Sequence, residues 1–259
     1  MSPLENRVAV ITGGASGIGA ATARVLASQG ATVVIADINA DAARTVAADV
    51  GGHAFTLDVR DADAIEAFAD WVESDIGPTR IVVTSAGLVQ APLPPEDFPL
   101  DLFDNINAVN QRGTWLTLRA FARHMLPRHA GEMVTISSIV AERSVPLHAY
   151  APGKAAVLNM TQCLAAEWGM AGLRVNTVQP GYTRTPALQA QIDAGNRDPG
   201  LLEANSTLGR MVEPEEIGAA IAFLVSDQAA AITGVALPVD AGYFCAGSWH
   251  PYGGVRPRN

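Results

Sequence analysis

The sequence predicts an α/β fold, in which a parallel sheet is covered by helices on both faces. Short runs of β-branched residues alternate with longer helical segments from the start of the chain, which is the pattern of successive βαβ units. The strand candidates, such as Val8–Thr12, are nearly continuous apolar runs, as strands buried on both faces should be. Because 259 residues suit one large α/β domain better than two small ones, we expect a single domain over residues 1–259.

The expected elements follow one another in strand–helix order. Strands are expected at Val8–Thr12, Thr32–Ala36, His53–Leu57, Arg80–Thr84, Met133–Ile136, Arg174–Val178 and Ala236–Val239. Helices are expected at Ile18–Gln29, Asp41–Asp49, Asp61–Ser74, Leu100–Asn107, Ala108–Leu126, Tyr150–Met170 and Pro214–Val225. The polar, weakly periodic residues 185–208 predict a variable, mobile insertion with one or two short helices. Residues 246–259 predict a C-terminal tail that carries Trp249 and Tyr252.

Composition and charge argue against several classes of partner. The net charge is −9 and the 17 lysines and arginines are scattered along the chain, so we expect no binding to nucleic acid or to a membrane. No apolar run reaches the roughly 18 residues of a membrane helix or forms a signal-peptide core, and we expect a soluble cytoplasmic protein. Cys163 and Cys245 are expected to be free thiols, and the histidines show no spacing that predicts a metal site.

A glycine-rich turn follows the first strand. The segment Thr12–Gly19 reads Thr-Gly-Gly-Ala-Ser-Gly-Ile-Gly and opens the first expected helix. Glycines let backbone N–H groups approach a pyrophosphate, and the helix N-terminus adds partial positive charge. Asp37 ends the second strand, where a carboxylate can accept the ribose hydroxyls of an adenosine and repels a 2′-phosphate. NAD is therefore favoured over NADP, although Asp37 could also only cap the next helix.

Tyr150 and Lys154 stand one helical turn apart at the head of an expected helix. Side chains at this spacing share one face, with about 5–6 Å between their Cβ atoms. Because the reference pKa of tyrosine is about 10, a phenol needs a neighbouring cation to act as a base near neutrality. Taken alone, the pair also fits a solvated lysine beside a half-buried ring, so its meaning depends on the rest of the chain.

With the glycine turn and this pair in place, the chain resembles the short-chain dehydrogenase/reductase family along nearly its whole length. The shared motifs are Thr12–Gly19, Asp37, Asp58-Val59, Ser85-Ala86-Gly87, Asn110, Ser137-Ser138, Tyr150/Lys154, Asn176, Pro180-Gly181 with Thr185, Pro214-Glu215-Glu216 and Thr233-Gly234. The resemblance implies a single Rossmann-type domain with about seven parallel strands. It also implies a homotetramer packed through Ala108–Leu126 and Tyr150–Met170.

The resemblance further implies the roles of individual residues. Tyr150 would be the general acid/base, and Lys154 would lower the pKa of Tyr150 and bind the nicotinamide ribose. Ser138 would hydrogen-bond the substrate oxygen, and Asn110 would hold a water for a proton relay. The implied cofactor contacts are Gly13, Ser16, Gly17, Ile18, Gly19, Asp37, Asp58, Val59, Ala86, Gly87, Tyr150, Lys154, Pro180, Gly181, Thr183 and Thr185. On the sequence alone, the Asp58 segment could equally be a plain turn.

Some positions depart from the family pattern. Thr84 stands where the family usually has Asn, so a contact that supports the backbone is expected to change. The interval from Ser138 to Tyr150 is one residue shorter than usual, and Ser137 has the usual spacing. We keep Ser138, because neighbouring strand residues point to opposite sides and the resemblance implies that the active serine is the second of the pair. Pro152 lies inside the Tyr-x-x-x-Lys motif and is tolerated, since N–H groups of a first helical turn lack intrahelical partners.

These features predict an NAD-dependent oxidoreductase that transfers hydride between nicotinamide and a secondary alcohol or its ketone. The segments expected around the substrate carry Gln90, Glu142, Arg143 and His148 beside apolar side chains. This mixture suits a small polyol, sugar or similar polar alcohol, and it suits a hydroxysteroid almost as well. One alternative is an NADPH-dependent carbonyl or hydroxysteroid-type reductase, which Asp37 argues against. A non-catalytic nucleotide-binding sensor or scaffold is another, but it would need no paired phenol and ammonium.

Overall fold

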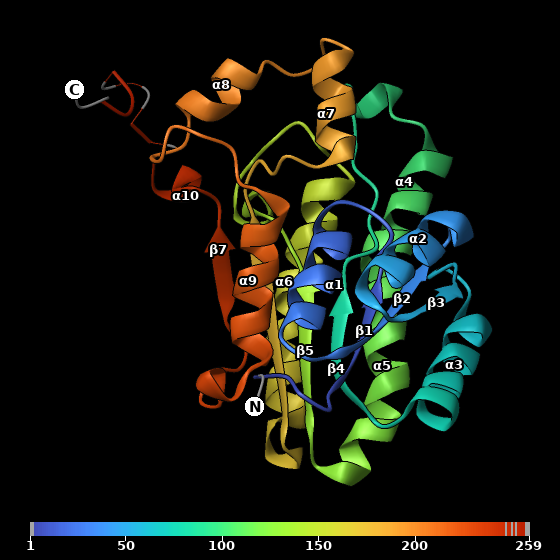
Figure 1. The fold of residues 1–259 in the computed structure, drawn as a ribbon. Coiled ribbons are helices and arrows are strands. Elements are labelled where there is room, and N and C mark those ends of the chain that lie inside the picture. The colour runs from blue at the N-terminus through green and yellow to red at the C-terminus, as the bar shows by residue number, and fades with distance from the viewer. Residues whose placement is uncertain (1–2, 247, 250, 252, 257–259) are drawn as a thin grey trace.

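Seven parallel strands form one sheet in the computed structural model, which describes residues 3–246, 248–249, 251 and 253–256. The strands are β1 (Val8–Thr12), β2 (Thr32–Asp37), β3 (His53–Thr56), β4 (Thr79–Thr84), β5 (Gly131–Ile136), β6 (Leu173–Pro180) and β7 (Ala236–Val239). They lie in the order β3-β2-β1-β4-β5-β6-β7 (Figure 1). The order reverses between β1 and β4, so the sheet is doubly wound. The predicted fold class and number of strands are confirmed.

Helices cover both faces of this sheet (Figure 1). The flanking helices are α1 (Gly17–Ser28), α2 (Ala40–Val50), α3 (Ala62–Trp71), α5 (Thr114–Met125), α6 (Tyr150–Trp168) and α9 (Pro214–Val225). Shorter helices are α4 (Leu100–Asn107), α7 (Pro186–Asp193), α8 (Pro199–Ala204) and α10 (Tyr243–Ala246). Within the described ranges, no helix has the length and apolarity needed to cross a membrane.

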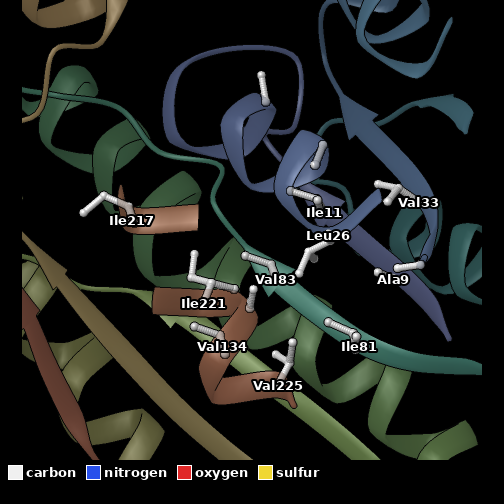
Figure 2. Packing of buried hydrophobic residues seen from close by; sticks show 14 of the residues in the cluster. Ala9, Ile11, Leu26, Val33, Ile81, Val83, Val134, Ile217, Ile221 and Val225 are labelled. Carbon is white, nitrogen blue, oxygen red and sulfur yellow. The ribbon is translucent and has the colours of Figure 1, made fainter. Parts of the chain in front are cut away.

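Each face of the sheet has its own apolar core, because neighbouring strand residues point to opposite sides. In β1, Ile11 belongs to the core beneath α1, α2 and α9, and Val10 belongs to the core beneath α3, α5 and α6. Figure 2 shows the first core, where Ile11 and Val83 of the strands lie with Leu26 of α1 and Ile221 of α9. The nearly continuous apolar strands are therefore buried on both faces, as predicted.

Two predicted helices are interrupted by π-helical turns. The helix expected over Asp61–Ser74 ends as α3 at Trp71 and continues as a π-turn over Val72–Ile76. The helix expected over Ala108–Leu126 begins with a π-turn over Ala108–Gly113 before α5. A Cβ on Gly113 would lie 2.8 Å from Cγ2 of Val59, so the second turn forms where the chain packs closely against a distant segment. Such turns often occur at functional sites.

The insertion holds two short helices, as predicted. Residues 185–208 hold α7 and α8, which stand above the carboxyl ends of the strands (Figure 1). Arg184 at the base of this insertion forms ion pairs with Glu203 at 2.6 Å and Glu213 at 3.1 Å. The helix α10 was not predicted, and it ends at Ala246, the first residue of the expected tail. The Asp240 carboxylate accepts hydrogen bonds from backbone N–H groups at the start of this helix, while Tyr252 lies outside the described residues.

Candidate active site

The carboxyl ends of four neighbouring strands bring the predicted site residues to one edge of the sheet. β1 leads into the glycine turn, β4 leads towards Ala86 and Gly87, β5 leads towards Ser138, and β6 ends at Pro180 before Gly181. These strands are paired in parallel, so their carboxyl ends point the same way. In open α/β sheets this edge, beside the reversal of strand order, is where ligands bind.

The glycine turn has no room for side chains at Gly13 and Gly19. Gly13 has a φ of +66°, and a Cβ on it would lie 2.4 Å from the Ala86 nitrogen. A Cβ on Gly19 would lie 2.1 Å from the Gly13 carbonyl oxygen. Ser16 is the N-cap residue of α1, but its side chain makes no capping hydrogen bond, and the first turn of α1 has no acidic residue. The partial positive charge of this helix end therefore suits an anion such as a pyrophosphate.

The loop after β6 meets the glycine turn from the opposite side. Gly17 has a φ of +49°, and a Cβ on it would lie 3.2 Å from Cγ2 of Thr185. The Thr185 hydroxyl accepts a hydrogen bond from the Leu188 N–H and caps α7. The Thr183 hydroxyl donates to the Gly181 carbonyl at 3.0 Å. Thr185 thus lies beside the glycine turn, and the hydroxyls of both predicted nicotinamide-side threonines stabilise the loop itself.

Asp37 lies at the end of β2, against the glycine turn. One carboxylate oxygen accepts from the Ala15 N–H at 3.1 Å and the other accepts from the Asn39 N–H at 2.9 Å. Asp37 therefore does more than cap the following helix, whose N-cap is Asn39. A carboxylate fixed beside the phosphate turn is where an adenosine ribose would bind. Together with the glycine cradle, this arrangement fits a nicotinamide dinucleotide.

The predicted adenine-side residues are held by protein contacts. The Asp58 carboxylate accepts from the Arg60 side chain at 2.9 Å, and this pairing holds the pKa of Asp58 below its usual value. Val59 is buried against Gly113. The Asp58 segment is thus a turn stabilised by Arg60 that lies beyond the carboxyl end of β3.

Tyr150, Ser138 and Lys154 form the chemical centre of this edge. The Ser138 hydroxyl acts on the Tyr150 phenol and lowers its pKa, which places the two side chains next to each other. Lys154 is buried, its ammonium donates to the Ile136 carbonyl at 2.7 Å, and its Nζ atom lies 5.6 Å from the centroid of the Tyr150 ring. Burial lowers the pKa of Lys154 to about 8. An acid/base, a hydroxyl donor and a cation are therefore brought together.

The direction of the Tyr150 pKa differs from our expectation. We expected Lys154 to lower it, but the pKa of Tyr150 is raised, because burial disfavours the phenolate. The hydrogen bond from Ser138 opposes this effect and is the smaller of the two causes. The protein alone therefore keeps the phenol protonated.

The two neighbouring serines have different partners. Ser137 is buried, and its hydroxyl donates to the Lys154 carbonyl at 2.8 Å, so it ties β5 to α6. Ser138 is the one that reaches Tyr150. The shortened interval between Ser138 and Tyr150 thus does not separate their hydroxyl groups. The choice of Ser138 over Ser137 agrees with this geometry.

Asn110 lies in the π-turn before α5, with its amide turned towards the loop after β4. Its Oδ1 atom accepts from the Leu88 N–H at 2.7 Å, and its Nδ2 atom donates to the Leu88 carbonyl at 2.9 Å. A Cβ on Gly87 would lie 3.5 Å from Asn110 Oδ1 and 3.8 Å from Lys154 Nζ. Asn110 and Lys154 therefore both approach Gly87, and the amide of Asn110 fixes the backbone of Leu88; the expected water relay stays a prediction.

The polar residues expected to face substrate differ in their contacts and in their exposure. Arg143 donates to the Phe244 carbonyl at 3.1 Å and stacks on its ring, while His148 is exposed. Glu142 accepts from the buried Gln179 at 2.9 Å, beside the Ser138 segment. Gln90 is only 6% exposed and does not line an open surface. Its carbonyl oxygen accepts from the backbone N–H groups of α6, a role that no sequence motif signals.

Two further expectations concern Thr84 and metal binding. The Thr84 hydroxyl is buried and has no hydrogen-bond partner among the described residues. Thr84 thus supplies no hydroxyl hydrogen bond to the backbone among these residues. In the part of the chain that the structure describes, no group of three or more His, Cys, Asp or Glu side chains could hold a metal ion.

The chain as a whole is similar to known enzymes. The family model described as enoyl-(acyl carrier protein) reductase matches residues 13–244. D-threitol dehydrogenase of Mycolicibacterium smegmatis is 39% identical over 93% of this chain and 94% of its own. A solved structure named ribose-5-phosphate isomerase, from Brucella melitensis, has a TM-score of 0.97 and 42% identity, covering 99% of both chains. The 3-ketoacyl-(acyl-carrier-protein) reductase of Brucella melitensis, solved with NADH, has a TM-score of 0.88 and 32% identity, covering 93% of this chain and 99% of its own.

Proposed function

We propose that this chain, which belongs to the short-chain dehydrogenase/reductase family, is an NAD-dependent dehydrogenase of a small polar secondary alcohol. Relatives of the family support the broader activity, an oxidoreductase that acts on alcohols. The observation that carries the finer proposal is that the Ser138 hydroxyl acts on the Tyr150 phenol beside the buried Lys154. A protein that only bound a nucleotide would need no such set, which argues against a sensor or scaffold.

The proposed chemistry follows from where these groups lie. Bound nicotinamide supplies the acceptor or donor of the hydride. As the phenolate, Tyr150 takes the hydroxyl proton of an alcohol, and as the phenol it gives a proton to a ketone. Ser138 donates a hydrogen bond to the same oxygen as negative charge develops on it. Lys154, held by the Ile136 carbonyl, supplies a positive charge on the Tyr150 side of the site and stabilises the phenolate when it forms.

NAD is the proposed cofactor because of Asp37. Its carboxylate is fixed by the Ala15 and Asn39 N–H groups at the point where an adenosine ribose would lie. A 2′-phosphate placed there would be repelled by this charge. Asp37 therefore argues against the alternative of an NADPH-dependent carbonyl or hydroxysteroid-type reductase.

A polyol or sugar is the substrate class that we favour. The relative named D-threitol dehydrogenase supports it, as does the polar pair of Glu142 and Gln179 next to the Ser138 segment. Hydrogen-bonding side chains near the reacting hydroxyl are what selection of a polyhydroxylated substrate needs. A hydroxysteroid has fewer hydroxyl groups that could bind to these side chains.

A homotetramer and a cytoplasmic location complete the proposal. Large apolar side chains on α4 and α5 are exposed, with Leu100 at 80%, Phe103 at 40% and Trp115 at 43%. Such side chains are typical of surfaces that pack against another chain. Light scattering coupled to gel filtration tests this part, and a monomer across the micromolar range would contradict it.

The experiment that tests the function is a substrate panel. Polyols, sugars, hydroxy acids and hydroxysteroids are each incubated with NAD, and formation of NADH is followed. We expect turnover with polyols or sugars, and an absence of NADH formation with every class would overturn the proposal. Ribose 5-phosphate, incubated without nicotinamide and assayed for ribulose 5-phosphate, tests the activity named for one structural neighbour. An isomerase would convert it, and the proposed dehydrogenase would not.

A further inference from the structure

Gln90 lies in the loop between β4 and α4 but makes its contacts with the start of α6. Its side-chain carbonyl accepts hydrogen bonds from two backbone N–H groups, those of Ala149 at 2.9 Å and Tyr150 at 3.0 Å. The residue is only 6% exposed, and the two bonds join residues far apart in the sequence. A buried glutamine thus contacts the backbone of the proposed general acid/base itself.

The first turn of α6 depends on this contact. A helix leaves its first N–H groups without intrahelical partners, and a side chain at the N-cap usually accepts from some of them. Here the N-cap is Ala149, which cannot do so. The Ala151 N–H donates to the Leu147 carbonyl, the Gly153 N–H donates to the Ala149 carbonyl, and Pro152 has no N–H group. The two remaining donors are those that Gln90 accepts.

The orientation of the Gln90 amide follows from these donors. If its oxygen and nitrogen were exchanged, NH₂ would face two N–H groups. In the orientation observed, Nε2 is buried and has no hydrogen-bond partner among the described residues. Leaving the buried Nε2 donor unpaired costs free energy. The stabilising contact of this side chain is therefore the one that its carbonyl makes. A carboxylate of nearly the same shape would accept from the same two N–H groups without an unpaired donor.

The other end of the loop is also fixed. Two residues before Gln90, both backbone groups of Leu88 are bound by the amide of Asn110. Asn110 therefore anchors the segment from which Gln90 reaches α6. The carbonyl of Gln90 is thus supported by a rigid part of the fold rather than by a freely moving loop.

We propose that Gln90 is a positioning residue, which fixes the amino end of α6 and thereby the Tyr150 phenol relative to the Ser138 hydroxyl. This inference rests on the proposed function for its effect on catalysis, but the contact itself does not. Tyr150 is the first residue of α6, where helices fray most readily when their N–H groups have no acceptors. Displacement of a reacting group by about 1 Å can lower a rate about a hundredfold.

The test compares Gln90→Met, which removes the acceptor at similar size, with Gln90→Glu, which retains it. Gln228→Met makes the same chemical change on an exposed surface far from the site. Hydrogen exchange of the Ala149 and Tyr150 amides is measured without cofactor or substrate. We expect exchange about tenfold faster in Gln90→Met and unchanged in Gln90→Glu and in the control. If Gln90→Met does not fold, Gln90→Asn, whose carbonyl is too short to reach, takes its place.

Turnover is the second measurement on the same proteins. In Gln90→Met, kcat should fall at least about tenfold while the Kd of NADH changes less than about threefold. In Gln90→Glu, kcat measured at alkaline pH, where it no longer changes with pH, should stay within about threefold of wild type. Unchanged amide exchange in Gln90→Met would overturn the cap. Faster exchange with unchanged kcat would overturn the positioning role. Full activity in a parallel Tyr150→Phe variant would instead refute the proposed function and leave the amide exchange result standing.

Discussion

Burial favours the uncharged form of both central side chains of the site, Tyr150 and Lys154. It raises the pKa of the Tyr150 phenol and lowers that of the Lys154 ammonium to about 8. In both cases the uncharged form is favoured, because a buried charge loses its hydration. The Ser138 hydrogen bond acts in the opposite direction on Tyr150. At the scale of single residues, the site is therefore built from groups whose proton affinities differ from those in water.

Lys154 should make the stability of the protein depend on pH. Its pKa is about 8 in the folded protein and 10.5 as a free side chain. Between these values the unfolded chain binds more protons, so the free energy of unfolding rises with pH. From about pH 7.5 to about pH 9.5, wild type should gain about 2 kcal/mol relative to Lys154→Met. Urea unfolding of both proteins across this range checks it, and a constant difference between them would contradict it.

Ser138 and Ser137 should fail in different ways when replaced by alanine. Ser138→Ala removes the hydroxyl that reaches Tyr150, and kcat should fall about a hundredfold. Ser137→Ala removes the bond to the Lys154 carbonyl and should cost about 1 kcal/mol of stability. Steady-state kinetics and denaturant unfolding of both variants separate the two effects. A larger loss of kcat in Ser137→Ala would reverse the assignment.

Asp37 should determine the choice of cofactor. Asp37→Ser removes the charge that would repel a 2′-phosphate, so the ratio of kcat/KM with NAD to that with NADP should fall at least about tenfold. Asp41→Ser, an exposed acidic residue on α2, serves as the matched control. An unchanged ratio in Asp37→Ser would show that another feature selects the cofactor.

At the scale of elements, the two ends of the strands have different roles. The carboxyl ends carry the candidate site, and the amino ends carry an ion cluster around Glu132, which is buried at the start of β5. Arg80 at the start of β4 pairs with Glu132 at 2.8 Å. Arg7 and Arg174 approach Glu132 at 3.9 and 3.8 Å. This cluster joins neighbouring strands where no ligand is expected.

Replacing Glu132 should therefore reduce stability without affecting catalysis directly. Glu132→Gln leaves three arginines without their shared buried partner. We expect a loss of about 2 kcal/mol, below the usual cost of breaking a buried pair because Arg80 is one-third exposed. Asp227→Asn is the control, since Asp227 is 83% exposed where it pairs with Arg7. Equal stability losses in the two variants would refute this role of Glu132.

The elements that the sequence predicted are those with a clear periodicity. All seven strands and the long helices have apolar patterns that tertiary contacts reinforce, so they lie where expected. The π-turn before α5 depends on the close approach of Gly113 to Val59, and α10 depends on the Asp240 carboxylate. Neither contact leaves a periodic signal, because each joins a short segment to one particular partner.

At the scale of the whole molecule, one sheet edge collects residues from most of the chain. The glycine turn, Asp37 and the Tyr150/Lys154 pair could be proposed from the sequence because their motifs are local, and Ser138 followed from the family resemblance. The contact of Gln90 with the start of α6 could not be predicted, because its two hydrogen bonds depend on how the loop after β4 folds onto α6. The raised pKa of Tyr150 was also missed, because burial is a property of the folded chain.

The most direct test of the account is the turnover of Tyr150→Phe with NAD and the best alcohol of the substrate panel. This change removes one hydroxyl and leaves the glycine turn and Asp37 intact. We predict that kcat falls at least about a thousandfold, while the Kd of NADH, measured by fluorescence, stays within about threefold of wild type. Turnover at the wild-type rate would contradict the central claim that Tyr150 is the general acid/base.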